Sequence, residues 1–175
     1  MTDPRYPIGR FEAPTTITPA HIAGWVADIE ALPDQMRAAV AGLSDADLDT
    51  PYRPGGWTLR QVVHHVPDSH LNCYVRFKWA LTEAEPTIKP YDEVAWAELP
   101  DVAGTSVGVS LDLLGALHAR WAVLLRSLTE ADWERRFVHP ASGSVSLAEA
   151  AGSYAWHGRH HLAHITSAVA REGGR

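Results

Sequence analysis

Histidine is the residue type whose placement in this sequence could do chemistry. Seven of the ten histidines fall in two short stretches, HHVPDSH at 64–70 and HGRHHLAH at 157–164. Neutral imidazole nitrogen is a good ligand for zinc, nickel and similar divalent ions. Because the two stretches are far apart in the sequence, a metal site that uses both has to be assembled by the fold.

His157 and His161 are four residues apart, a spacing that places both side chains on one face of a helix. On an ideal helix, His161 lies within roughly 40° of the core-facing direction and His157 within about 80°. His160 and His164 point further toward solvent. The same spacing occurs in the HExxH helix of zinc proteases. Here Gly158 replaces the glutamate that acts as the base, which argues against that class.

The spacing does not identify a third ligand. His70 lies nearest the centre of the apolar stripe of its predicted helix, while His64 and His65 lie on its two flanks. His65 continues a polar stripe that is either a solvated face or the wall of a wet cleft. A buried, hydrogen-bonded core histidine is the alternative for each of them, and we interpret His118 in that way.

Four long amphipathic segments position these histidines. Each opens with residues that favour a helix start, at Thr18-Pro19, Thr58-Leu59-Arg60-Gln61, Ser110 and Ser146-Leu147-Ala148-Glu149. The second helix is expected to end near residue 82, the third near 128 and the fourth near 170. Pro33 and Pro67 are expected to kink, bend or divide the first and second helices.

The remaining segments predict how these helices are joined. Residues 1–17 form an extended arm, 44–57 a connection, 129–136 a short extra turn and 137–145 a hairpin or irregular loop. The long connection at 83–109 allows a crossover in place of a simple up-down order. The sequence thus predicts one all-α domain over residues 1–175, a four-helix bundle with a long connection between its second and third helices.

Composition and charge exclude several classes of partner. The net charge is −6 and no block of basic residues occurs, so a nucleic-acid partner is not expected. The single cysteine, Cys73, suits a reducing compartment and is interpreted as a core residue. No stretch approaches about 18 consecutive apolar residues, and no signal peptide is recognised, so we expect a cytoplasmic protein without a membrane partner.

The segments GGWTLRQVVHHVPDSH, PYDE and WHGRHHLAHI resemble, in this order, the DinB-like superfamily and above all its branch of YfiT-type metal-dependent hydrolases. The resemblance extends over nearly the whole chain, from YPIG to the last helix. It implies a four-helix bundle, usually a homodimer, with three histidines that hold one Zn²⁺ or Ni²⁺ per chain. By this resemblance the ligands are His65, His157 and His161. Pro67 departs from the ordinary helix former expected two residues after a ligand.

Three neutral imidazoles leave a divalent ion with an open coordination position, which is typical of catalytic sites. We therefore expect a metal-dependent hydrolase that acts on a small substrate. One alternative, implied by the resemblance, is an S-transferase that uses a low-molecular-weight thiol such as bacillithiol or mycothiol. The other is a metal-binding bundle without enzymatic activity.

The sequence offers only weak candidates for residues that assist the reaction. Asp68 and His64 lie close to His65 along the chain and are candidates for acid–base chemistry. Arg76 and Arg159 are candidates for binding an anionic substrate, with solvent exposure as the alternative. None of these residues is distinguished by spacing alone.

Overall fold

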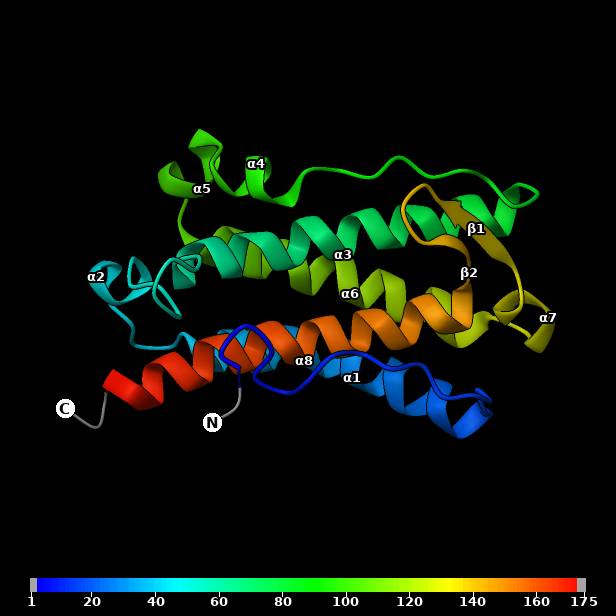
Figure 1. Ribbon diagram of the computed structural model, residues 1–175, viewed down its shortest axis with the longest axis horizontal. Coiled ribbons are helices and arrows are strands. Elements are labelled where there is room, and N and C mark those ends of the chain that lie inside the picture. Colours follow the sequence, from blue (N-terminus) through cyan, green and yellow to red (C-terminus); the bar gives the residue numbers. More distant parts are fainter. Residues whose placement is uncertain (1–2, 173–175) are drawn as a thin grey trace.

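The computed structural model describes residues 3–172, which form a bundle of four long helices (Figure 1). These helices are α1 (Pro19–Ala39), α3 (Leu59–Thr82), α6 (Val107–Ser127) and α8 (Leu147–Glu172). The shorter elements are α2 (Asp45–Leu48), α4 (Glu93–Ala97), α5 (Pro100–Gly104), α7 (Glu130–Trp133) and the antiparallel strands β1 (Arg136–His139) and β2 (Gly143–Ser146). The predicted all-α four-helix bundle is confirmed, with one small hairpin added to it.

Helix starts follow the N-cap signals of the sequence at three of the four long helices. Thr18, Thr58 and Ser146 each exchange hydrogen bonds with the residue three positions later, so each start is a capping box. The third start was predicted at Ser110, but α6 begins at 107. The correction has a simple cause, because the Ser106 side chain accepts a hydrogen bond from the second backbone N–H of α6.

Both internal prolines lie within continuous helices. Pro33 is inside α1 and Pro67 inside α3, and neither divides its helix. A proline removes one N–H from the helical ladder, and packing of the buried face outweighs that loss here. His65, two residues before Pro67, therefore lies in regular helix.

The order of the four helices around the bundle differs from their order in the chain. α1 packs on α6 and α8, and α3 packs on the same two helices, so α1 and α3 occupy opposite corners. In Figure 1, α3 and α6 run in the same direction, opposite to α1 and α8. The connection at 83–106 must therefore return the length of α3, roughly 36 Å for its 24 residues. This is the crossover that the long connection allowed.

Two hydrophobic clusters form the core, and a polar layer separates them. One cluster contains Phe77 and Trp121, and the other contains Leu32 and Ile165. Along α3, residues 59–66 contribute to the second cluster and residues 73–80 to the first. The buried histidines of α3 lie at or between these two runs, so the imidazoles occupy the middle of the bundle.

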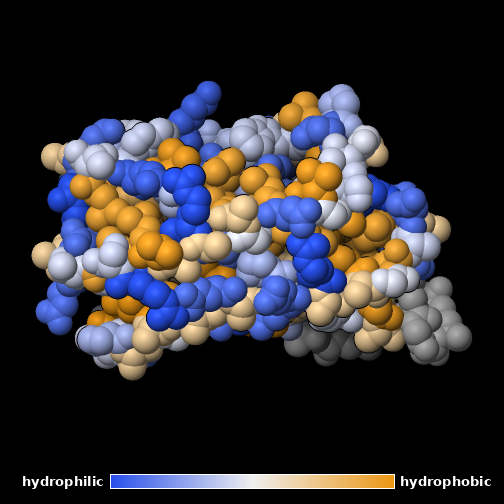
Figure 2. Space-filling view, turned by 180° about the vertical axis from the view of Figure 1, so that it is seen from behind, coloured by the Kyte–Doolittle hydropathy of each residue, from blue (hydrophilic) through white to orange (hydrophobic). Residues whose placement is uncertain are grey.

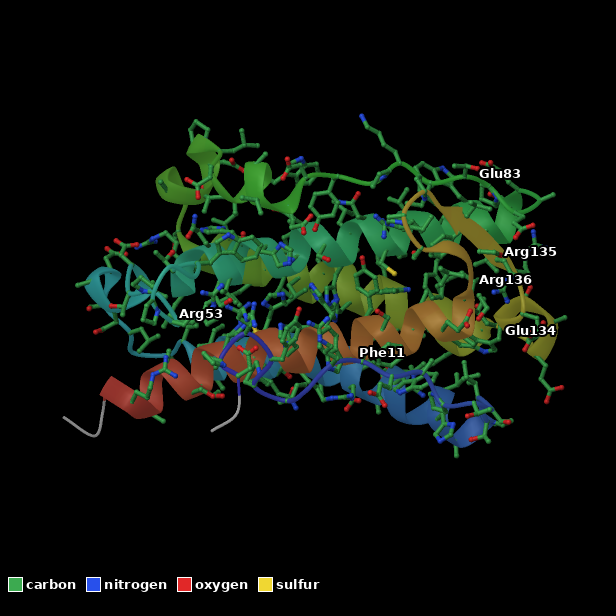
Figure 3. All side chains as sticks on the ribbon, viewed as in Figure 1. Phe11, Arg53, Glu83, Glu134, Arg135 and Arg136 are labelled. Carbon is green, nitrogen blue, oxygen red and sulfur yellow. The ribbon has the colours of Figure 1, made fainter. Side chains whose placement is uncertain are left out.

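The β1–β2 hairpin closes one end of the bundle. Arg135 donates hydrogen bonds to the backbone oxygens of Ala80, at 2.5 Å, and Glu83, at 3.0 Å. Figure 3 shows Glu83, Arg135 and Arg136 together at this end. These contacts fix the hairpin against the end of α3 and carry His139, the last residue of β1, toward the space between α3 and α8.

α6 combines bundle packing with an apolar outer face. Its length and mean hydropathy would allow it to cross a membrane, although Asp112 and His118 interrupt its apolar residues. Trp121 is buried in the bundle, whereas Leu113 and Val123 are exposed. Figure 2 shows apolar surface among polar residues on this side of the molecule.

Candidate metal centre

His65 of α3 and His157 and His161 of α8 converge between the two helices. One ring nitrogen from each lies within 4.8 Å of the others, and the Nε2 atoms of His65 and His157 are 3.2 Å apart. Two nitrogens bound tetrahedrally at about 2.0–2.1 Å from one zinc ion lie about 3.3 Å apart. The donor atoms and their spacing therefore fit a shared divalent ion.

The three imidazoles are held in the neutral form that binds metal. Burial lowers the pKa of His65 to about 4, with a smaller contribution from His160. Burial also lowers the pKa values of His157 and His161 well below the ordinary value, and the neighbouring imidazoles add to the shift. At neutral pH each ring therefore keeps a lone pair for an ion.

The outer nitrogen of His157 begins a chain of hydrogen bonds across the bundle. His157 Nδ1 lies 3.2 Å from His70 Nε2, and His70 Nδ1 lies 2.9 Å from His118 Nε2. His118 Nδ1 lies 2.5 Å from the backbone oxygen of Ile29. This histidine relay, formed by His157, His70, His118 and Ile29, joins all four long helices.

The end of the histidine relay fixes the direction of every bond in it. The Ile29 oxygen can only accept, so His118 donates from Nδ1 and accepts at Nε2. Burial lowers the pKa of His118 to about 4 and that of His70 well below its ordinary value, so each ring carries one proton. His70 consequently donates from Nδ1, and His157 donates from Nδ1 to His70. The lone pair of His157 Nε2 is thereby directed toward His65 and the ion site.

His161 has an outer partner of its own. Its Nδ1 lies 3.4 Å from His164 Nδ1, which leaves Nε2 for an ion. His160, His161 and His164 also form a group with metal-ligand spacing. His160 and His164 do not border the large cavity described below, whereas His161 does. We therefore interpret the contact between His161 and His164 as one that holds the His161 ring in place.

The N-terminal arm buries two histidines that sequence reasoning directed toward solvent. His160 is 7% exposed and His164 is 3% exposed. Tyr52 stacks on His164 with ring centroids 3.9 Å apart, and Trp156 stacks on His160 and donates a hydrogen bond to the backbone of Gly9. Figure 3 shows Phe11 of the arm beside α1 and α8. Helical periodicity carries no information about a covering segment, so this burial was missed.

A cavity of about 550 Å³ opens directly beside the three histidines. Its volume is typical of small-molecule sites. The cavity is bordered by the side chains of Trp57, His65, Ser69, Arg76, Pro90, Tyr91, Glu93, His139, Tyr154, His157 and His161. The residues of the connection at 83–106 thus form one wall, which explains why this connection is long.

The weak candidates for assisting residues separate in the structure. Asp68 and His64 do not border the cavity, and His64 Nδ1 is 2.7 Å from the Ser110 hydroxyl. Burial raises the pKa of Asp68 to about 6, and Asp101 adds to this shift. Proximity to His65 in the sequence was therefore a poor guide, because successive helical residues point in different directions.

The two candidate arginines also differ. Arg159 is exposed and forms an ion pair with Asp28 on α1, so the solvent alternative holds for it. Arg76 is buried and borders the cavity. Cys73 is fully buried, and burial raises the pKa of its thiol, which suits the core role expected for it. His139 borders the cavity from β1 and had no signal in the sequence, because it is isolated in a short strand.

Gly158 has a packing role that explains the missing glutamate beside His157. A Cβ atom at Gly158 would lie 2.5 Å from Leu32 Cδ2 of α1. Leu32 is buried, so any side chain at position 158 would force Leu32 to shift within the packed core. This close approach sets the position of α8, and with it the positions of His157 and His161.

A family model described as the DinB superfamily matches residues 28–165. The chain belongs to the DinB superfamily. A relative from Bacillus mycoides strain KBAB4, called a "putative metal-dependent hydrolase", is 59% identical over 167 residues, which cover 95% of this chain and 96% of the relative. A protein of the same description from Bacillus cereus strain B4264 is 58% identical with the same coverage.

A solved structure has the same fold. It is YfiT from Bacillus subtilis, described as "a probable metal-dependent hydrolase with an unusual four-helix bundle topology". The two structures superpose with a TM-score of 0.95 at 46% sequence identity, covering 98% of this chain and 99% of YfiT. The expected resemblance to the YfiT branch is confirmed, and the shared topology includes the parallel α3 and α6.

Proposed function

We propose that this DinB-superfamily protein is a metal-dependent hydrolase of a small substrate, with one Zn²⁺ or Ni²⁺ held by His65, His157 and His161. One observation carries the proposal. Three neutral imidazoles converge at the wall of a cavity of about 550 Å³, and within residues 3–172 no carboxylate or thiol joins their group. The descriptions of the relatives from Bacillus as metal-dependent hydrolases support the same reaction class.

A divalent ion held by His65, His157 and His161 would act as a Lewis acid that activates water and polarises a carbonyl oxygen. The residues of the chain supply the rest of the site. Trp57, Tyr91 and Tyr154 give the cavity aromatic walls. Burial and the charge of Arg76 lower the pKa of His139. Its Nδ1 accepts a hydrogen bond from the Ala141 N–H, so the neutral ring carries its proton on Nε2 and can donate from that nitrogen.

Metal content tests the proposed ligands. We expect about one zinc or nickel ion per chain by elemental analysis, and its loss in a variant that combines His157→Ala with His161→Ala. His64→Ala is the matched control, because it removes an equally buried imidazole next to His65 that does not join the metal group. Stoichiometric metal in the double variant, or its loss in the control, would contradict the ligand assignment.

An activity panel tests the reaction. The metal-loaded protein is incubated with small esters, amides and electrophiles, each with and without bacillithiol or mycothiol. Hydrolysis products without thiol are expected, and they should disappear in the double variant. Consumption of thiol into a conjugate, without hydrolysis products, would assign the site to thiol transfer. No turnover of any compound would favour a metal-binding bundle without enzymatic activity.

A further inference from the structure

Arg76 of α3 carries a buried charge that the described part of the chain does not neutralise. Arg76 is only 7% exposed, and no carboxylate of residues 3–172 lies within ion-pair distance of its guanidinium. Its hydrogen bond to a side chain is a long one of 3.5 Å, from Nη1 to the neutral Tyr154 hydroxyl. A guanidinium has five N–H donors and is always charged, so a buried arginine without an anion is unfavourable.

The unneutralised charge borders the same cavity as the three histidines. His65 and Arg76 both lie on α3, and their Cα atoms are about 16 Å apart along its axis. Tyr154, beside Arg76, and His161 likewise lie two turns apart on the antiparallel α8. The cavity therefore extends along the groove between α3 and α8, from the proposed ion toward a guanidinium.

The other groups near Arg76 suit the recognition of an anion. The phenols of Tyr91 and Tyr154 lie close enough to Arg76 to feel its charge, and the Ser69 hydroxyl lies beside both phenols, so neutral donors lie near the guanidinium. Glu93 also borders the cavity, but it is exposed and forms no ion pair with Arg76. Arg76 is the one lysine or arginine among the residues that border this cavity.

We propose that Arg76 forms a carboxylate-binding subsite, so that the ligands of this cavity are small monoanionic acids whose carboxylate is separated from the reacting group by an apolar or aromatic spacer. A single planar guanidinium matches one carboxylate in charge and can bind it through two parallel hydrogen bonds. The aromatic walls match the spacer. The assignment of this ligand as a substrate rests on the proposed function, but its binding to Arg76 does not.

Binding to the metal-free protein isolates this subsite from the ion. Chelator-treated protein is titrated with phenylacetate and with its neutral analogue phenylacetamide, and Kd is measured by ligand-observed NMR. We expect phenylacetate to bind about tenfold or more tightly than phenylacetamide, which corresponds to about 1.4 kcal/mol or more, because hydrogen bonds to a charged group are the stronger kind. Arg76→Gln is expected to remove this preference, and Arg76→Lys to restore part of it.

Lys89→Gln is the matched control for the loss of one positive charge. Lys89 borders a neighbouring hollow of about 500 Å³, which shares Arg76, Pro90 and Tyr91 with the histidine cavity but none of the histidines. The preference should persist in Lys89→Gln. If phenylacetate shows no preference in the natural protein, if the preference survives Arg76→Gln, or if it is lost in Lys89→Gln, the proposed subsite is wrong.

Thermal unfolding separates a binding role from a structural role. Arg76→Met removes a buried charge that no carboxylate compensates, so the Tm of the metal-free variant should rise. A fall in Tm would show that Arg76 stabilises the fold, and the proposal would then be overturned. Both measurements use metal-free protein, so they test the carboxylate subsite even if the protein is not a hydrolase. A protein that is a hydrolase but shows no preference for phenylacetate would refute the subsite and leave the hydrolase assignment intact.

Discussion

The histidine relay predicts that a residue on α6, which does not touch the ion, controls metal affinity. His118 accepts from His70 and donates to Ile29, and so sets which nitrogen of His157 is free. In His118→Ala, His70 loses this directional partner, and His157 is no longer held in one tautomer. Replacing such an outer partner typically weakens metal binding about 10–100-fold, which corresponds to about 1.4–2.7 kcal/mol.

The same variant should also lose stability, so affinity and stability have to be separated. His118→Ala leaves the Ile29 oxygen and the His70 N–H without partners, and each unpaired buried group costs about 1–3 kcal/mol. His64→Ala is the matched control, because it breaks a buried imidazole bond to Ser110 that does not touch the relay. We expect His64→Ala to lower Tm with little change in the Kd for zinc.

His118→Gln tests the direction of the relay. Its amide can donate to Ile29 through nitrogen and accept from His70 through oxygen, so it preserves the order of donors and acceptors. Zinc affinity is measured by competition with a chromophoric chelator for all three variants. Nearly natural affinity in His118→Gln together with a loss of about tenfold or more in His118→Ala is the expected pattern. If His118→Ala binds zinc with unchanged Kd while its Tm falls, the relay does not orient His157.

Three further perturbations follow from the structure. Gly158→Ala should destabilise the bundle by about 1–3 kcal/mol in chemical denaturation, because its Cβ would clash with Leu32. Gly24→Ala, which has open space around it, should instead stabilise α1 by about 0.5–1 kcal/mol. Equal effects of the two substitutions would argue against the close approach of Gly158 to Leu32. Asp68→Asn should raise stability by about 1–2 kcal/mol above pH 6, after allowance for solvent screening. The pKa of the Asp68 carboxyl rises from 3.8 in the unfolded chain to about 6 in the folded protein, so its ionised form opposes folding. The stability advantage of Asp68→Asn should therefore vanish below pH 4, where the carboxyl is protonated in both states. A stability advantage that is the same at pH 3 and pH 8 would contradict this reasoning. Removal of the metal by a chelator should leave the helical circular dichroism intact but lower Tm. The expected loss in the free energy of unfolding is about 2.7 kcal/mol relative to protein with free metal at 100 times Kd. Unfolding on chelation would show that the core clusters alone do not hold the bundle together.

The sequence predicted those parts of the fold that depend on local signals. Capping boxes and apolar periodicity located three helix starts, because each depends on residues within one turn. The i, i+4 spacing likewise identified His157 and His161 as a pair on one face. The choice among His64, His65 and His70 could not be made from spacing, because all three are buried and their roles differ only through partners on other helices.

Tertiary contacts account for what the sequence did not predict. His160 and His164 were directed toward solvent because a helical wheel contains no N-terminal arm. His139 gains its position from the hairpin, and Arg76 of α3 becomes part of a cavity wall because the crossover connection covers it. No local pattern specifies the path of either segment. The relay was equally invisible, since its direction depends on one backbone oxygen of α1.

The arrangement of the helices has a consequence for the biosynthesis of the protein. His65 and His157 are 92 positions apart, and the second belongs to the final helix. A ribosome that adds about 5–20 residues per second needs roughly 5–20 s to make the intervening segment. Throughout this interval the nascent chain displays His65 without its two counterparts. The three-histidine group is therefore completed only when α8 is made and docks on α3.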